Sequence, residues 1–169
     1  MGIISRLVTY ARRQRDPVRW ARSIGVTIGD DCRLLDVSFS TEPYLVTLGD
    51  HVSATSTTFL THDGGVWVTR ANHPDIDVFG RIIVGSNVYF GFGCIVMPGV
   101  TIGDDVIVGA GSIVTKDVPS GMVVAGVPAR VIKTTGDYVD KVLSISFPTK
   151  NMPQAEKERY IRERLLDGA

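Results

Sequence analysis

A six-residue period runs through the middle of the chain and limits its architecture more than any other feature. From Val84 the sequence divides into the blocks VGSNVY, FGFGCI, VMPGVT, IGDDVI, VGAGSI, VTKDVP, SGMVVA and GVPARV. Most blocks open with an aliphatic or aromatic residue, and in the first seven blocks the fifth residue is again small or aliphatic. Two apolar places in six fit neither the spacing of a helix nor the alternation of an ordinary strand. The pattern predicts short strands joined by tight corners, with three blocks making one triangular coil.

The repeat also predicts which residues stack in successive coils. Glycines near the corners let the chain turn or let neighbouring coils approach closely. At a spacing of eighteen residues, Gly91 and Gly93 recur as Gly109 and Gly111, and Val88 recurs as Val106 and Val124. We expect these residues to lie directly above one another. Related blocks cover 28–39 and continue from Leu48, and the slip between them predicts a loop at 41–44.

Both ends of the chain carry helical patterns that could cover a solenoid whose coils bury their apolar faces only against neighbours. Apolar residues in 2–15 have helical spacing, and Asp16 and Pro17 suggest the start of a second short helix that carries Val18 and Trp20. From Pro153 the charged sequence predicts a helix that packs against the body of the protein or against a neighbour. We therefore expect a helical cap at 1–23, a repeat body at 24–133 and an extension at 134–169.

The period stops after His62, where the sequence reads D-G-G-V-W-V-T-R-A-N-H-P-D-I-D-V-F-G. A segment of this length at 63–81 has to leave the solenoid as an excursion. Long loops on a rigid scaffold are usually functional or disordered, and Trp67, Val68 and Phe79 provide apolar anchors that favour order. We interpret the excursion as an arm beside an active site.

Composition argues against several functions. Eighteen basic residues balance eighteen acidic ones, so no overall field favours nucleic acid. Cys32 and Cys94 lack metal-type or C-x-x-C spacing and suit a reduced compartment. Arg6 interrupts the apolar start, and no run approaches a membrane-spanning length, so we expect a cytoplasmic protein. The arginines near the N-terminus could still give weak peripheral contact with anionic lipid.

The segment from Val84 to Lys133, with its V-T-K-D-V-P and A-G-V-P-A-R motifs, closely resembles hexapeptide-repeat acyltransferases such as galactoside, maltose, serine and xenobiotic acetyltransferases. The resemblance covers roughly residues 24–133. It implies an all-β fold, the left-handed parallel β-helix, whose handedness the period alone does not give. It also implies acetyl-coenzyme A as co-substrate, no metal, and a homotrimer with active sites between adjacent subunits.

His62 is the candidate catalytic base. It occupies an outward place immediately before the excursion, where the resemblance implies a catalytic histidine. A sugar hydroxyl becomes an adequate nucleophile when a base of near-neutral pKa takes its proton during attack on a thioester. His51 is interpreted as a solvated residue of an ordinary block, and His73 as a turn residue before Pro74 that could contact the acceptor. Neither cysteine lies near His62 in the repeat, so we expect direct transfer without an acyl-enzyme.

The remaining candidate site residues fall into two groups. The resemblance, together with the need of phosphates for cations and of pantetheine for small residues, assigns coenzyme binding to Tyr89, Gly91, Gly109, Ala110, Thr115, Lys116, Arg130 and Lys133. Acceptor binding is assigned to arm residues Asp63, Trp67, Asn72 and His73. Many sugar acetyltransferases carry G-H-P at the catalytic loop, whereas this chain has T-H-D-G-G.

We therefore expect an acetyltransferase that modifies a sugar hydroxyl, in surface polysaccharide or lipopolysaccharide biosynthesis. A small-molecule acceptor with another hydroxyl or an amine, such as an amino sugar, serine or a xenobiotic, is an alternative. A γ-type carbonic anhydrase on the same fold would need zinc-binding histidines on adjacent faces, and the chain has three histidines in all. A noncatalytic β-helix scaffold would share the repeats but needs no base at the arm.

Overall fold

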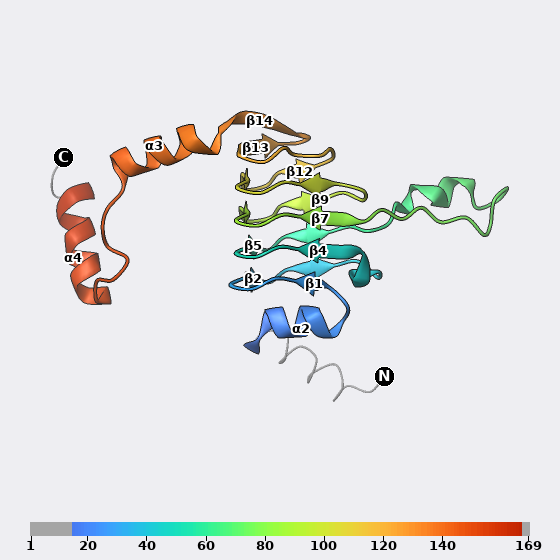
Figure 1. Ribbon diagram of the computed structural model, residues 1–169, viewed down its shortest axis with the longest axis horizontal. Coiled ribbons are helices and arrows are strands. Elements are labelled where there is room, and N and C mark those ends of the chain that lie inside the picture. Colours follow the sequence, from blue (N-terminus) through green and yellow to red (C-terminus); the bar gives the residue numbers. More distant parts are fainter. Residues whose placement is uncertain (1–14, 167–169) are drawn as a thin grey trace. The chain divides into compact units, whose positions relative to one another are not determined.

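The computed structural model describes residues 15–166 and contains three sheets of short strands stacked in coils (Figure 1). The first sheet comprises β1 (Thr27–Ile28), β4 (Val46–Leu48), β7 (Ile82–Val84) and β10 (Thr101–Ile102). The second comprises β2 (Arg33–Leu35), β5 (Ser53–Thr55), β8 (Tyr89–Phe90), β11 (Ile107–Val108), β13 (Met122–Gly126) and β14 (Ala129–Thr134). The third comprises β3 (Ser38–Phe39), β6 (Thr58–Phe59), β9 (Ile95–Val96) and β12 (Ile113–Val114). Each pass of the chain visits the three sheets in this order, so the backbone winds as a parallel β-helix.

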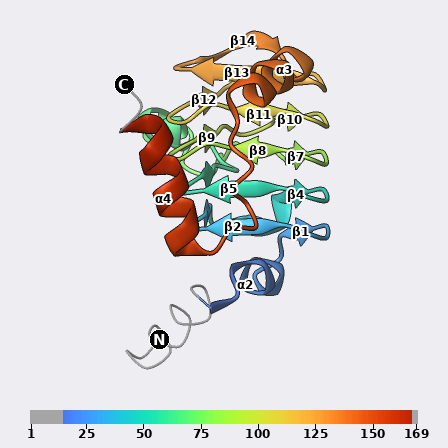
Figure 2. The ribbon, with the colours of Figure 1, turned by 90° about the vertical axis from the view of Figure 1, so that its left-hand side faces the viewer.

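Strand pairing confirms the eighteen-residue stacking in the middle coils. Tyr89 pairs with Ile107, and the amide of Gly91 donates to the carbonyl of Val108. A Cβ atom on Gly91 would lie 2.5 Å from the backbone nitrogen of Ala110. Because no side chain fits at that distance, glycine is required where these two coils approach. Figure 2 shows the strands of the second sheet one above another.

The predicted position of Val124 is wrong. Val124 pairs with Val108, so it does not continue the column that Val88 and Val106 begin. The last coil is shorter than the others, because Val118 rather than residue 120 bridges to Ile102. The chain then turns back, and β13 and β14 form an antiparallel hairpin instead of a further coil.

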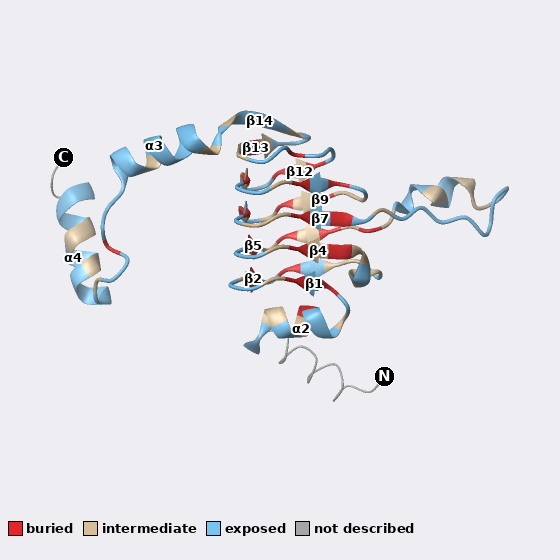
Figure 3. Cartoon of the chain, in the orientation of Figure 1, coloured by how far each residue is buried: buried red, intermediate tan, exposed pale blue. Residues whose placement is uncertain are grey.

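Both apolar places of the first six blocks, and the fifth place of the seventh, face a single core, as the period predicted. The buried side chains of these blocks, none more than 6% exposed, are Val84, Val88, Phe90, Cys94, Val96, Val100, Ile102, Val106, Val108, Ser112, Val114, Val118 and Val124. Figure 3 shows buried positions along the inner side of the coils and exposed positions along the arm. Of the two cysteines, Cys94 is buried in this core and Cys32 is only half-buried.

An aromatic column joins the lower coils to the N-terminal cap. The rings of Phe39 and Phe59 stack at 5.5 Å, and Phe59 meets Phe90 edge-on at 5.5 Å. Trp20 of α2 (Pro17–Ser23) extends the column, with its ring centroid 6.3 Å from that of Phe39. The Asp16 carboxylate accepts a hydrogen bond from Arg19 N, which confirms the predicted helix start. The helix expected over 2–15 lies outside the described residues, apart from its last position.

A ladder of four residues with positive φ forms the corner between the first and second sheets. Asp31, His51, Asn87 and Asp105 have φ of 52°, 54°, 57° and 56°, a region that Asp, Asn and His tolerate better than most residues. His51 Nδ1 lies 2.8 Å from Asn87 Oδ1, and Asn87 Nδ2 donates to Asp105 Oδ1 at 2.6 Å. His51 is exposed but belongs to this ladder, which corrects the expectation of a merely solvated residue.

The C-terminal residues form a second compact unit from Val139. Helix α3 (Thr135–Ile145) was not predicted, whereas α4 (Gln154–Leu165) confirms the expected charged helix after Pro153. Within this unit the Tyr160 ring contacts Phe147 edge-on, and the guanidinium of Arg164 lies 3.6 Å above it. In residues 15–166 no helix has the length and apolar character to cross a membrane.

Candidate active site

The arm leaves the solenoid at the corner between the third and first sheets, after β6 and before β7. His62 and Phe79 form an antiparallel bridge at its base. On either side of this bridge, Asp63 N donates to Val78 O at 2.9 Å and Gly80 N donates to Thr61 O at 2.8 Å. The excursion therefore starts and ends at one point of the coil and extends away from it (Figure 1).

Internal contacts give the arm a defined shape. A 3-10 helix covers Gly64–Thr69, and the Asp63 carboxylate accepts from Gly65 N at its start. Arg70 then donates to Pro74 O at 2.7 Å and to Asp77 Oδ1 at 2.6 Å. This guanidinium ties the outgoing and returning parts of the arm together.

Glu42 is the residue that contacts His62. Its Oε2 atom lies 2.9 Å from His62 Nδ1. The two are brought together by coil stacking, because Ser38 pairs with Thr58 and Phe39 with Phe59, a register that sets residue 42 beside residue 62. A 3-10 turn at Pro43–Leu45 follows Glu42 and returns the chain to β4. The dyad therefore spans two consecutive coils at one corner.

Two threonines hold the Glu42 carboxylate. Thr41 Oγ1 donates to Oε1 at 2.6 Å, and the buried Thr61 donates through Oγ1 to Oε2 at 2.9 Å. Hydrogen bonds from Thr41 and His62 lower the pKa of Glu42 to about 2, and the bond from Thr61 adds to the effect. Glu42 is consequently ionised at neutral pH.

An ionised carboxylate can only accept hydrogen bonds, so it fixes the tautomer of His62. In a neutral His62 the proton then lies on Nδ1, which faces Glu42, and Nε2 keeps a lone pair. The side chain of His62 is 41% exposed and that of Glu42 is 15% exposed. This arrangement presents a basic nitrogen on an accessible ring while its partner carboxylate stays shielded.

A cavity of about 320 Å³ lies at the base of the arm, between the dyad and the arm's inner side. Its lining residues are Thr41, Glu42, His62, Asp63, Gly64, Val66, Trp67, Arg70, Asp77, Val78 and Phe79. Of the four acceptor residues expected from the sequence, Asp63 and Trp67 are in this lining. Asn72 and His73 lie in an exposed turn of the arm outside it, where His73 N donates to Thr69 O.

The residues assigned to the coenzyme lie in the upper coils. Thr115 and Lys116 occupy the same corner as the arm, two coils above it, and both are exposed. Gly91, Gly109 and Ala110 lie at the corner between the second and third sheets. Tyr89 is on the outer face of β8, and Arg130 and Lys133 are on β14. Thr115 and Lys116 therefore lie at one end of the third sheet and the three small residues at the other, whereas Tyr89, Arg130 and Lys133 belong to the second sheet. None of these cations lines the cavity.

The three histidines lie apart: His51 is in the corner ladder, His62 is at the base of the arm and His73 is in its exposed turn. No cluster of three or more His, Cys, Asp and Glu side chains suited to a metal ion occurs in the part of the chain that the structure describes.

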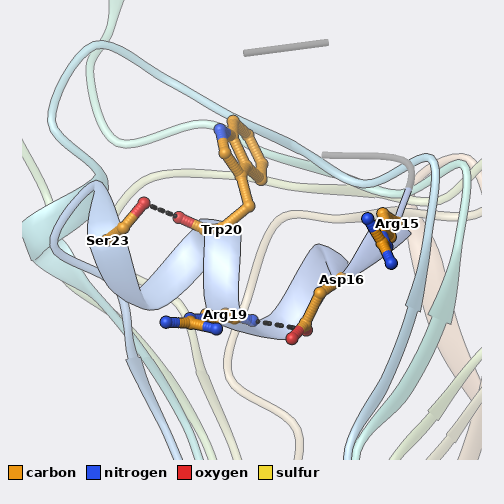
Figure 4. Close-up of a pocket in the computed structure, with 5 residues that line it drawn as sticks. All are labelled: Arg15, Asp16, Arg19, Trp20 and Ser23. Carbon is orange, nitrogen blue, oxygen red and sulfur yellow. Dashed lines mark hydrogen bonds between the residues drawn. The ribbon is translucent and has the colours of Figure 1, made fainter. Parts of the chain in front are cut away.

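A larger hollow of about 740 Å³ borders α2 and is lined by Arg15, Asp16, Arg19, Trp20 and Ser23 (Figure 4). Its internal hydrogen bonds belong to the helix itself: Arg19 N donates to Asp16, and Ser23 Oγ donates to Trp20 O. None of these five residues has the acid–base chemistry near neutral pH that the arm cavity has in His62. The arm cavity is the better candidate despite its smaller volume.

Sequence reasoning missed Glu42. The available signal was the slip of the period at 41–44, because residues added to a coil have to protrude at a corner. That corner is the one where the arm leaves in the next coil. Two irregularities at one corner of consecutive coils therefore indicate a shared site.

A family model and two known relatives match this chain. Residues 81–116 match the family model "Bacterial transferase hexapeptide (six repeats)". Protein CapG of Staphylococcus aureus is 49% identical over 151 residues, which cover 87% of this chain and 88% of CapG. Galactoside O-acetyltransferase of Escherichia coli (strain K12) is 41% identical over 101 residues, 57% of this chain, and the match spans about half of that protein (47%).

A solved structure has a similar fold over most of the chain. A galactoside acetyltransferase in complex with coenzyme A superposes with a TM-score of 0.57 and 26% identity, over 80% of this chain and 80% of that one. This similarity extends well beyond residues 81–116, which match the family model.

Proposed function

The chain belongs to the hexapeptide-repeat family of acyl-coenzyme A-dependent acetyltransferases, and we propose that the group it acetylates is a hydroxyl of a sugar. The observation that carries the proposal is the Glu42–His62 dyad at the mouth of the arm cavity. A scaffold or binding module has no need of an ionised carboxylate that fixes the tautomer of an exposed histidine.

In the proposed reaction His62 acts as general base. Nε2 takes the proton of the acceptor hydroxyl while its oxygen attacks the thioester carbonyl of acetyl-coenzyme A. The ionised Glu42 stabilises the imidazolium that forms, at a separation of 2.9 Å. When the carbon–sulfur bond breaks, the imidazolium returns a proton to the leaving thiolate, and the products are an acetyl ester and coenzyme A.

The positions of the cysteines support direct transfer without an acyl-enzyme. Cys94 is fully buried, and burial raises the pKa of its thiol, which disfavours the nucleophilic thiolate. Cys32 belongs to the corner between the first and second sheets, where its Sγ interacts with Asp30 O and Gly49 O. Neither cysteine is among the residues that line the arm cavity.

For the coenzyme we propose a path along the third sheet above the arm. Lys116, which follows β12 of that sheet, and Arg130 and Lys133, which lie on β14 of the second sheet, would supply the cations that phosphates need. Gly91, Gly109, Ala110 and Thr115 would let the pantetheine arm lie against backbone, and Tyr89 would contribute an aromatic wall. The solved complex of a relative with coenzyme A supports this choice of ligand.

We infer that the solenoid has the left-handed sense of the family and that the chain works as a homotrimer. At the arm, Trp67 is 78% exposed and Val68 is 85% exposed. Exposed apolar side chains in such an excursion are stabilised when a neighbouring subunit buries them. A trimer would also give the arm cavity a second wall, with each active site between two subunits.

The proposed acceptor is a sugar of surface polysaccharide or lipopolysaccharide, and the relative named for galactosides supports a sugar. Asp63 and Trp67 would contact it from the cavity, whereas Asn72 and His73 would do so only from the outer turn. We place the reaction in the cytoplasm, which the two unpaired cysteines support. Other hydroxyl or amine acceptors, including amino sugars, serine and xenobiotics, are the alternatives to be tested.

The test is an acceptor screen with purified protein and acetyl-coenzyme A. Release of free thiol and the mass of the product are measured with simple glycosides, nucleotide sugars, glycans, serine and xenobiotic amines, and His62→Ala is the matched control. An O-acetylated sugar formed by the native enzyme alone is expected. Acetylation of serine or a xenobiotic but of no sugar would refute the proposed acceptor. Absence of both coenzyme binding and transfer would favour a scaffold.

A further inference from the structure

The charge of the arm cavity is dominated by carboxylates. Of the described residues that line it, Glu42, Asp63 and Asp77 are acidic and only Arg70 is a permanent cation. Arg70 is engaged within the arm, since it donates to Pro74 O at 2.7 Å and to Asp77 Oδ1 at 2.6 Å. Its charge is therefore balanced by Asp77, and its position is fixed by the arm's own backbone.

Asp63 differs from the other two carboxylates in what it contacts. Glu42 is engaged with His62 and two threonines, and Asp77 with Arg70. Asp63 Oδ1 accepts from Gly65 N at 2.8 Å. No cation is paired with Asp63 among the ion pairs of residues 15–166. Asp63 is exposed, lines the cavity and follows the catalytic histidine directly in the chain.

We propose that Asp63 binds hydroxyl groups of the acceptor next to the one that reacts, and thereby selects uncharged sugars against anionic ones. The inference rests on the proposed function and narrows its substrate class. A carboxylate offers two acceptor oxygens, and hydrogen bonds to an ionised group are stronger than those between neutral groups. A carboxylate or phosphate on the acceptor would instead meet a like charge that Arg70 is not placed to offset.

Size and shape fit this assignment. The cavity volume of about 320 Å³ can hold a single sugar ring, and Val66, Trp67, Val78 and Phe79 give it an apolar side opposite the polar groups. A pyranoside has the same division, with hydroxyl edges and apolar C–H faces. A hydroxyl held by Asp63 would bring its neighbour on the ring towards His62.

The experiment uses a matched pair of methyl pyranosides that differ only at C6, one with a hydroxymethyl group and one with a carboxylate. Steady-state kcat/KM is measured for the native enzyme, for Asp63→Asn, and for Asp75→Asn as a control. Asparagine keeps an oxygen that can accept from Gly65 N but removes the charge. Asp75 is an arm acid outside the cavity lining, so its replacement changes the arm's net charge by the same amount.

The native enzyme is expected to favour the neutral pyranoside by about tenfold or more in kcat/KM at low ionic strength, and added salt should narrow the gap. Asp63→Asn should raise KM for the neutral sugar and reduce the preference at least about threefold, whereas Asp75→Asn should change neither. An unchanged preference in Asp63→Asn, or a native enzyme that favours the uronide, would overturn the inference and leave the sugar acetyltransferase intact. Failure of the native enzyme on every sugar would refute both.

Discussion

The carboxylate of Glu42 lies 2.9 Å from Nδ1 of His62, although twenty residues separate the two in the chain. The contact exists because two consecutive coils are irregular at the same corner, one with a short loop and the next with an arm. A solenoid that is uniform along most of its length thus acquires a reactive pair at one place. The proposed base, the carboxylate that contacts it and the arm cavity all belong to that corner.

Replacing His62 by alanine should lower turnover by about a hundredfold or more, because the hydroxyl loses its general base. Affinity for acetyl-coenzyme A should stay near that of the native enzyme, since the proposed coenzyme residues lie in the upper coils. Steady-state kinetics and calorimetric titration with the coenzyme measure the two effects. Near-native turnover would remove His62 from the mechanism.

The low pKa of Glu42 predicts how stability depends on pH. A carboxyl group whose pKa falls from 4.5 to about 2 on folding stabilises the folded chain above pH 4.5. This contribution is lost as the pH falls from about 4.5 towards 2. The difference in unfolding free energy between the native protein and Glu42→Gln should therefore shrink over that range. A difference that stays constant from pH 6 to pH 3 would contradict the assignment.

Lys116 and Arg130 should contribute to coenzyme binding through its phosphates. Each alanine variant should weaken affinity for the coenzyme by about tenfold. This is the lower end of the range for charge-assisted hydrogen bonds, because both side chains are exposed and solvent screens their charges. Titration with acetyl-coenzyme A at two salt concentrations tests this, and Lys150, which lies beyond the repeat body, provides the control through Lys150→Ala. Unchanged affinity in the double variant would place the phosphates elsewhere.

The aromatic column predicts a large cost for losing its middle ring. Phe59 is fully buried between Phe39 and Phe90. Phe59→Ala should lower the unfolding free energy by about 3 to 5 kcal/mol, through lost burial and the cavity that remains. Chemical denaturation measures it. Because α2 rests on the same column through Trp20, a loss below 1 kcal/mol would show that the lower coils hold together by other contacts.

The proposed trimer predicts a specific response to charge in the arm. Light scattering should report three chains for the native protein under conditions of activity. Val68→Lys places an ammonium at an apolar arm position outside the cavity lining, so the variant should dissociate more readily on dilution. A native protein that is fully active as a monomer would refute the trimer.

The period predicted the core well, because its two apolar places per block face inward in every complete coil. It failed where a coil departs from eighteen residues. Val124 pairs with Val108 and not with Val106, because the last coil is shortened before Val118. No residue in V-T-K-D marks that change. The antiparallel hairpin after it has apolar residues at similar spacing to a coil, so the sequence pattern does not separate the two.

For the site, the break in the period placed His62 at the base of the excursion, and the resemblance to hexapeptide-repeat acyltransferases singled it out as the candidate base. For Glu42 the slip of the period at 41–44 marks only the corner and not the contact with His62. That contact depends on the register between β3 and β6, which is offset by twenty residues and not by the eighteen that the regular coils suggest. Asp63 was identified from the sequence as an acceptor-binding candidate. The sequence does not show that Asp77 binds Arg70 and leaves Asp63 without a cation, because that ion pair depends on how the arm folds.

The bridge between His62 and Phe79 closes the arm where it starts, so the arm's length has no effect on the alignment of the coils above and below. Residues can be gained, lost or exchanged between Asp63 and Val78 without shifting a single strand of the solenoid. Such a segment behaves as an interchangeable unit: replacing it would change the lining of the arm cavity while the coils and His62 stay unchanged.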